Sequence, residues 1–277
     1  MLESIVVKRL ETIEEIEEAR QLEREIWASE SVPPHQIISF INHGGLIMGA
    51  YLEKELIGFN YSHPAFVEGE VYLYSHMLGI KREFRELGVG ELLKLRQKEL
   101  ASDLGYEKCK WTFDPLEARN GYLNFSKLRV YSQKYIPNCY GNLADPFNCL
   151  LPSDRLLVEW NLNDEDFLRW DIKINELLEG AGPLVPWNLS IVGLPILDKD
   201  NNFNGKITYL NDAYMLPIPS NFQKIKIESP SLAEDWRYKT RAIFQAMFEQ
   251  GFIVVYLKQE NEHISQYLFV KRSLFAL

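Results

Sequence analysis

Residues 72–105, YLYSHMLGIKREFRELGVGELLKLRQKELASDLG, decide the fold that this sequence can adopt. An apolar, β-prone run over 71–80 leads through a charged turn at 81–87 to the glycines Gly88 and Gly90. Leucines then recur at helical spacing as far as residue 104. The stretch therefore predicts a strand, a loop and a long amphipathic helix, in that order.

The predicted loop has the features of a phosphate-binding site. Glycine has no side chain, so the backbone can approach a ligand closely, and the first turn of a helix leaves N–H groups without intrahelical partners. Arg85 stands at the mouth of the loop and adds a positive charge. We expect a bound pyrophosphate to be surrounded by Arg85, Glu86, Leu87, Gly88, Val89 and Gly90.

Composition places the chain among globular proteins. Its 277 residues are 46% hydrophobic and 13% aromatic, which suits one large domain or two closely packed ones. No apolar run approaches the ~18–20 residues that cross a bilayer, and the N-terminus lacks the pattern of a signal peptide. We therefore expect a cytoplasmic protein without membrane contact.

Charge and cysteine content exclude other classes. A net charge of −9 argues against a nucleic-acid surface. Three cysteines without C-x-x-C spacing indicate buried thiols, so neither a disulfide framework nor a metal site is predicted. Between residues 81 and 98, six basic residues face three acidic ones, a local excess that suits a polyanionic small molecule.

Hydrophobic periodicity predicts a mixed α/β fold in two parts, 1–150 and 151–277. Outside the opening stretch, the expected elements of the first part are a strand at 4–8, helices at 12–27 and 35–41, strands at 46–52 and 56–62, a strand at 108–113 and a helix at 117–128. Those of the second part are a strand at 155–162, a helix at 164–178, and a β-α-β-β segment over 207–218, 231–250, 252–257 and 265–271.

The pattern Arg85-x-x-Gly88-x-Gly90, between a strand and a helix, resembles the acyl-CoA-binding motif of the GNAT superfamily of N-acyltransferases. The predicted order β-α-α-β-β-β-α is also the order of that family. The resemblance implies a mixed central sheet whose fourth and fifth strands splay apart to admit the pantetheine arm. It also implies acetyl-CoA or another acyl-CoA as co-substrate, bonded by backbone groups near Leu78 and Ile80.

The family's next signature is present only in part. Aligned on Lys127, it places Phe125 where many members have a tyrosine that acts as general acid, and Arg129 where they have glycine. Phenylalanine cannot protonate a thiolate, so the acid is Tyr122, one turn earlier, or solvent. Asn120 and Lys127 are carried over from the resemblance as cofactor-binding residues.

His76 is the predicted general base. The resemblance to arylalkylamine-type members of the family places a basic histidine at this position and a second histidine where Tyr74 stands, so Tyr74 is expected to orient His76. Strand alternation places Tyr74, His76, Leu78 and Ile80 on one face. An imidazole with a pKa near ~6.5 can accept the proton of an amine. The alternative is a structural histidine bonded to a backbone carbonyl.

Two functions remain open from the sequence. The first is transfer of an acetyl or succinyl group from CoA to a small amine or amino acid by direct attack, since no cysteine suggests an acyl-enzyme. The second is a non-catalytic acyl-CoA-binding module. The two-part layout resembles a bacterial branch of the family, in which the appended half completes the acceptor pocket or forms an oligomer interface, as in a homodimer. A succinyl enzyme should offer a buried cation, for which Arg119, Lys127 and Arg129 are candidates.

Overall fold

The computed structural model describes residues 4–27, 31–141, 151–163, 167–198 and 211–275. The chain divides into two compact units, of which unit 1 is residues 1–111 with 159–164 and unit 2 is residues 112–158 with 165–277. The boundary falls within strands β5 (Lys108–Phe113) and β7 (Arg155–Asn161). This division does not coincide with the expected boundary near residue 150, because residues 112–150 belong to the same compact unit as most of the C-terminal half.

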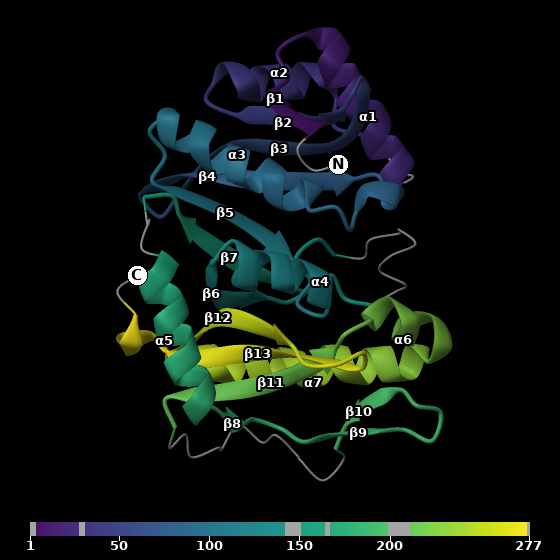
Figure 1. The fold of residues 1–277 in the computed structure, drawn as a ribbon, viewed down its shortest axis with the longest axis vertical. Coiled ribbons are helices and arrows are strands. Elements are labelled where there is room, and N and C mark those ends of the chain that lie inside the picture. Colours follow the sequence, from purple (N-terminus) through teal and green to yellow (C-terminus); the bar gives the residue numbers. More distant parts are fainter. Residues whose placement is uncertain (1–3, 28–30, 142–150, 164–166, 199–210, 276–277) are drawn as a thin grey trace. The chain divides into compact units, whose positions relative to one another are not determined.

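Unit 1 is a mixed sheet with helices on both faces (Figure 1). The strand order is β1-β2-β3-β4-β5, in which the first four strands are antiparallel neighbours and β5 runs parallel to β4. Besides β5, its elements are β1 (Ile5–Arg9), α1 (Ile13–Trp27), α2 (Pro34–Asn42), β2 (Leu46–Leu52), β3 (Glu55–Val67), β4 (Glu70–Ile80), the 3-10 turn η2 (Arg82–Phe84) and α3 (Val89–Asp103).

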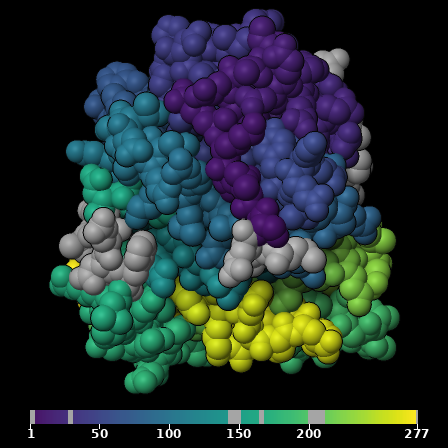
Figure 2. Space-filling view, turned by 45° about the horizontal axis from the view of Figure 1, so that its top comes forward, coloured from purple at the N-terminus to yellow at the C-terminus, as the bar shows by residue number. Residues whose placement is uncertain are grey.

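Side-chain alternation along the strands separates two cores in unit 1. One core packs α1 and α2 against residues such as Phe59, and the other packs α3 against residues such as Ile57. A capping box begins α1, because Thr12 Oγ1 accepts the Glu15 N–H at 3.2 Å and the Glu15 carboxylate accepts the Thr12 N–H at 3.1 Å. The segment that contains α1, purple in Figure 2, lies at the molecular surface. The predicted order of elements in this part of the chain is confirmed.

Unit 2 contains a further run of neighbouring strands. Its strand order is β6-β12-β13-β11-β8, antiparallel except for the parallel pair β11 and β8. Besides parts of β5 and β7, its elements are α4 (Ala118–Gly121), the π-helical η3 (Tyr122–Lys127), β6 (Tyr131–Ile136), α5 (Phe167–Gly180), β8 (Gly182–Pro183), β9 (Trp187–Leu189), β10 (Pro195–Leu197), β11 (Ala213–Pro219), α6 (Phe222–Glu228), α7 (Pro230–Glu249), β12 (Phe252–Gln259), β13 (Ile264–Lys271) and η4 (Arg272–Leu274).

The sheet of unit 2 also carries a core on each face. Ile174 of α5 packs with Val255 and Leu268 on one face. On the other face, Phe244 of α7 lies 5.2 Å from Phe269, measured between ring centroids. The mixed α/β fold class and the predicted β-α-β-β order near the C-terminus are therefore confirmed, with α6 as an additional short helix. Among the helices that the structure describes, none is long and apolar enough to span a membrane.

Candidate active site

The loop between β4 and α3 presents the start of a helix without a side-chain cap. Gly88 is the N-cap of α3 and has φ 75° and ψ 8°, in the left-handed region that favours glycine. Because glycine has no side chain to accept a bond, the first-turn N–H groups of α3 remain available to a ligand. An anion is the natural ligand at this position, since the helix dipole adds a partial positive charge.

The side chains of the loop divide into anchors and exposed groups. Val89 and Leu87 pack into the α3 core, so they hold the loop backbone against the sheet. Arg85 and Glu86 are exposed, and Arg85 Nε donates to the Ile80 carbonyl oxygen at 3.1 Å. This bond ties the guanidinium to the end of β4, at the entrance to the loop where the sequence places it.

Strands β4 and β5 pair over a short distance only. In this fully described part of the chain, the parallel ladder joins Leu73 to Cys109 and Tyr74 to Lys110 and then ends. The rest of β4, residues 75–80, continues without a β5 partner while it stays paired with β3. The expected splaying requires that β4 and β5 are not paired along their whole length, and the ladder meets this condition.

A β-bulge lies at His76. Tyr61 of β3 pairs with Met77 of β4, whereas the next residue, Ser62, pairs with Ser75. His76 is therefore an extra residue in β4, without a partner of its own across the ladder.

The bulge corrects one prediction about the faces of β4. Tyr74 and His76 lie with the rings of β3 on the α1–α2 side, whereas Leu78 and Ile80 pack into the α3 core on the other side. The prediction that all four share one face was wrong, because simple alternation ignores the extra residue, which shifts the phase of every later side chain.

A buried polar network holds the two residues that flank His76. Asn60 Nδ2 donates to the Met77 carbonyl oxygen at 3.0 Å and to Ser75 Oγ at 3.1 Å. Lys94 Nζ and Gln97 Nε2, both from α3, also reach Ser75 Oγ at 3.1 Å. Since these groups are all almost fully buried, the network fixes the backbone on either side of the bulge.

Lys94 is unusual within this network. Its ammonium lies 3.3 Å from the ring centroid of Trp111 and is bonded to Gln97 Oε1 at 2.7 Å, with a side chain that is 2% exposed. Burial lowers the pKa of Lys94 to about 8. Burial likewise raises the pKa of the neighbouring Cys109 thiol, so this cysteine is a poor nucleophile.

Five rings meet beside the bulge. His76 lies 6.0 Å from both Tyr61 and His63 and 6.4 Å from Tyr74, measured between ring centroids. Phe40 of α2 stacks on His63 at 4.9 Å. Sequence reasoning missed His63, which is 13 positions from His76 and becomes its neighbour only through the β3–β4 register, in which it pairs with Tyr74.

His76 presents an exposed imidazole beside the bulge. Its side chain is solvent-accessible, and among the described residues no hydrogen-bond partner of its imidazole is found. Its pKa is lowered, first by desolvation and second by the nearby charge of His63, so the neutral form of the ring is favoured. The alternative of a structural histidine bonded to a backbone carbonyl has no support in these contacts.

The other predicted residues lie in unit 2. Asn120 is exposed on α4, Tyr122 is half-buried at the start of η3, and Lys127 is exposed, with its ammonium 5.9 Å from the Tyr122 ring. A π-helical turn is rare and is found frequently at functional sites. Their approach to His76 stays a prediction.

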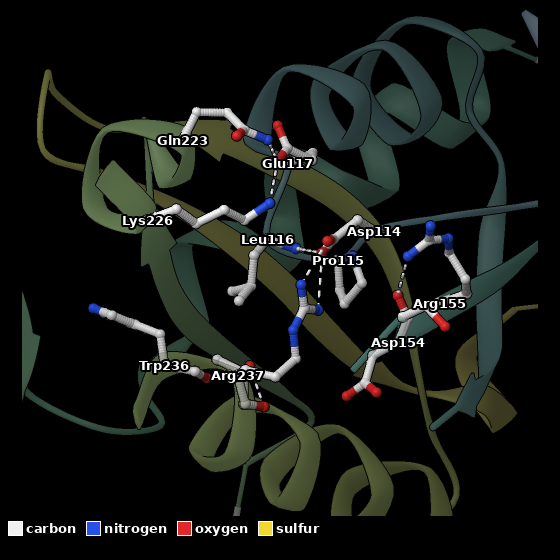
Figure 3. A network of polar contacts seen from close by, with 12 residues as sticks. Asp114, Pro115, Leu116, Glu117, Asp154, Arg155, Gln223, Lys226, Trp236 and Arg237 are labelled. Carbon is white, nitrogen blue, oxygen red and sulfur yellow. Dashed lines mark hydrogen bonds and ion pairs between the residues drawn. The ribbon is translucent and has the colours of Figure 1, made fainter. Parts of the chain in front are cut away.

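The turn that precedes α4 is held by three C-terminal elements (Figure 3). Arg237 of α7 binds the buried Asp114 carboxylate with two hydrogen bonds of 2.9 and 2.5 Å. Tyr267 of β13 donates to the Pro115 carbonyl oxygen at 2.8 Å, and Gln223 of α6 donates to Glu117 at 2.5 Å. The C-terminal half therefore fixes the start of the helix that carries Asn120 and Tyr122.

Two positions explain how this chain departs from the family signature. Phe125 is fully buried and packs edge-on against Phe113 and Tyr267, so it belongs to the core of unit 2. Arg129 has φ 55°, the left-handed conformation that glycine adopts without strain, which agrees with the alignment of this residue on a family glycine. The Arg129 guanidinium binds Asp171 at 2.8 and 2.7 Å, so its charge is already matched by a carboxylate.

Comparison with solved structures finds chains of similar fold. An IAA acetyltransferase from Bacillus cereus is 16% identical, with a TM-score of 0.45, and the match covers 57% of this chain and 99% of that one. The ribosomal-protein-S18-alanine N-acetyltransferase of Escherichia coli is 11% identical, with a TM-score of 0.46, over 59% of this chain and 98% of that one. Arabidopsis thaliana Naa50, bound to a bisubstrate analogue, is 15% identical, with a TM-score of 0.45, over 56% and 97%.

No protein family and no curated protein matches the sequence. At these identities and TM-scores the structural matches describe similarity of fold, so function has to be inferred from the residues of this chain.

Proposed function

We propose that this chain is an acyl-CoA-dependent N-acyltransferase of the GNAT superfamily, which transfers an acetyl or succinyl group to the amine of a small molecule or amino acid. The observation that carries the proposal is the placement of His76. At a bulge where β4 has lost its β5 neighbour stands an imidazole whose neutral form is favoured and for which the described residues offer no hydrogen-bond partner. The same strand leads into a helix N-terminus that has no side-chain cap.

Cofactor binding follows from the same geometry. The backbone around Gly88 and the first turn of α3 would hold the pyrophosphate, with Arg85 as its counter-charge. The unpaired edge of β4 between residues 75 and 80 would bond the pantetheine amides, as one added strand bonds another. Leu78 and Ile80 take part through their backbone groups, since their side chains belong to the α3 core.

The chemical task of His76 is removal of a proton. An amine with a pKa near ~10 is about one part in a thousand deprotonated at pH 7, a deficit of roughly 4 kcal/mol. His76 would first take this proton, and the neutral amine nitrogen would then attack the thioester carbonyl. The C–S bond breaks, the CoA thiolate leaves, and the attacking nitrogen gives its second proton to solvent as the amide forms. Tyr122 or solvent would then protonate the thiolate, because Phe125 cannot.

The C-terminal half would serve the acceptor side of the reaction. Because α6, α7 and β13 hold the turn before α4, loss of these elements would release Asn120 and Tyr122 from their positions. Of the three cations that could bind a succinyl carboxylate, Arg129 is paired with Asp171, and Arg119 and Lys127 are both exposed. We also propose that the C-terminal half completes the acceptor pocket or forms the interface of a homodimer, and that the protein is cytoplasmic.

The test is a two-stage assay. Acetyl-CoA, succinyl-CoA and free CoA are first screened for thermal stabilisation, and release of free CoA thiol is then measured with a panel of amines and amino acids. Stabilisation followed by acceptor-dependent thiol release is the expected result.

Stabilisation without turnover on any acceptor would instead favour a non-catalytic acyl-CoA-binding module. One observation speaks for this second candidate, namely that the position of the family's acid is the buried Phe125.

A further inference from the structure

The ammonium of Lys94 lies at the base of the fork where β4 and β5 separate. The parallel ladder ends with the pair of Tyr74 and Lys110, so the next residue of each strand is the first beyond the pairing. These two residues are Ser75 and Trp111. Lys94 Nζ lies 3.1 Å from Ser75 Oγ and 3.3 Å from the ring centroid of Trp111. The ammonium therefore contacts both strands at the point where they part.

The charge of Lys94 has no counter-ion within this unit. Among the residues that the structure describes, no carboxylate lies within ion-pair distance of the ammonium, and its closest partner is the neutral Gln97 Oε1, at 2.7 Å. A Cys109 thiolate would favour the ammonium, but burial raises the pKa of this thiol and keeps it protonated. Because a buried charge without a counter-ion costs stability, the presence of Lys94 here requires a reason other than stability.

The Ser75 hydroxyl adds a hydrogen that has no acceptor. Three nitrogen donors surround its oxygen at 3.1 Å, namely Asn60 Nδ2, Lys94 Nζ and Gln97 Nε2. The oxygen is the acceptor in all three bonds, and in the described part of the chain no group accepts the hydroxyl hydrogen. Ser75 is only 6% exposed, and a hydroxyl at this depth normally finds an acceptor. The base of the fork therefore carries a positive charge and one donor in excess.

A ligand that binds as proposed above directs its acyl group toward this site. The phosphate loop follows Ile80, and the unpaired edge of β4 runs from there back to Ser75, a distance of about 17 Å along the strand. A CoA whose pyrophosphate lies in the loop and whose pantetheine follows this edge ends with its acyl group at the base of the fork. Ser75 faces α3, whereas His76 lies on the α1–α2 side, so the acyl group and the amine approach from opposite faces of the sheet.

We propose that the acyl group ends in a carboxylate, as a succinyl group does, and that Lys94 and Ser75 bind this carboxylate. The inference rests on the proposed function and narrows its donor from acetyl or succinyl to a dicarboxylic acyl-CoA. The Ser75 hydroxyl donates its free hydrogen to the carboxylate, and the ammonium supplies the opposite charge. A carboxylate offsets the buried charge for as long as the ligand is bound, whereas the oxyanion of the reaction exists only in passing. Lys94 and Ser75 are thus residues that determine specificity.

The test is calorimetric titration with four ligands, namely succinyl-CoA, butyryl-CoA, acetyl-CoA and free CoA. Butyryl-CoA has the same number of acyl carbons as succinyl-CoA and no carboxylate, so the pair separates charge from chain length. The wild type should bind succinyl-CoA about tenfold or more tightly than butyryl-CoA, the effect of one hydrogen bond to a charged group. Lys94→Met should lose this preference, and its affinity for acetyl-CoA should change far less.

Lys98→Met is the matched control, because Lys98 lies one turn further along α3 and its ammonium approaches the Trp160 ring, at 5.7 Å, rather than the Ser75 hydroxyl. This variant should keep the preference for succinyl-CoA. Ser75→Ala should lose part of it, which gives a second test if Lys94→Met does not fold.

Equal affinity of the wild type for succinyl-CoA and butyryl-CoA would overturn the inference. A preference that survives unchanged in Lys94→Met, or in Ser75→Ala where the lysine variant is unfolded, would overturn it as well. If the wild type binds none of the four ligands, the proposed function itself is refuted. Binding of CoA and acetyl-CoA without a preference for the carboxylate refutes only the assignment of Lys94 and Ser75.

Discussion

Substitution of Gly88 tests the phosphate loop most directly, because the same helix offers a matched control. Gly88 at the start of α3 has φ 75°, and Gly105, just beyond its end, has φ 87°. An added Cβ at Gly105 would meet no atom within 4 Å. Left-handed backbone strain should cost both Gly→Ala variants about 1–2 kcal/mol, and at Gly105 no steric contact adds to this cost.

Only the Gly88 variant should also lose CoA binding. At a hundredfold excess of CoA over Kd, the wild type gains about 2.7 kcal/mol of stability, and Gly105→Ala should keep this gain. If the added methyl group raises Kd a hundredfold in Gly88→Ala, the gain at the same CoA concentration falls to about 0.4 kcal/mol. The larger Gly88→Val should abolish it.

The assay is thermal unfolding of the three variants and the wild type over a series of CoA concentrations. The unliganded Tm of both alanine variants should fall by several degrees, since about 1 kcal/mol corresponds to about 2–4 °C in a chain of 150–250 residues. A full CoA-induced shift in Gly88→Val would show that the loop does not hold the pyrophosphate, and with it the assignment of the cofactor site would be refuted.

Three further predictions concern buried or catalytic groups. His76→Ala should lower kcat by about 10²–10⁴-fold near pH 7, and by less at higher pH, where more of the amine is unprotonated. Equal rates of the variant and the wild type in a pH–rate profile would make His76 a structural residue. Arg237→Met should lower the free energy of unfolding in urea by about 3–5 kcal/mol, because it leaves the buried Asp114 carboxylate without its partner. A double variant with Asp114→Asn should recover part of this loss, and strictly additive losses from the two substitutions would contradict a direct pair. Between pH 8 and about 10.4, Lys94 binds fewer protons in the folded than in the unfolded state, so the stability of the wild type should rise with pH relative to that of Lys94→Met. A stability difference that does not change with pH would show that the pKa of Lys94 is not lowered to about 8.

Local sequence signals were sufficient for the frame of the site. The strand, loop and helix of residues 72–105 follow from periodicity and from two glycines, and both properties act between residues close in the chain. The position of His76 on β4 was also predictable, since it needs no long-range information, whereas its role as general base stays a prediction. The order of elements in unit 1 was predictable for the same reason.

The bulge in β4 and the neighbours of His76 depend on contacts between strands. A bulge arises where one strand has an extra residue between two pairs that hold it to its neighbour, so neither strand alone encodes it. For this reason the face of the sheet on which Leu78 and Ile80 lie could not be predicted from simple alternation. His63 joins His76 only through the register of β3 with β4.

The division between sequence and tertiary structure follows the range of the forces involved. The sequence by itself determined most of the secondary structure and the glycine-dependent loop, because backbone conformation and periodicity are short-range properties. Tertiary structure decided which polar groups are buried together, as with Asp114 and Arg237, which are 123 positions apart. Such pairs form because a charge removed from water requires a partner, and only the packed fold determines which partner is within reach.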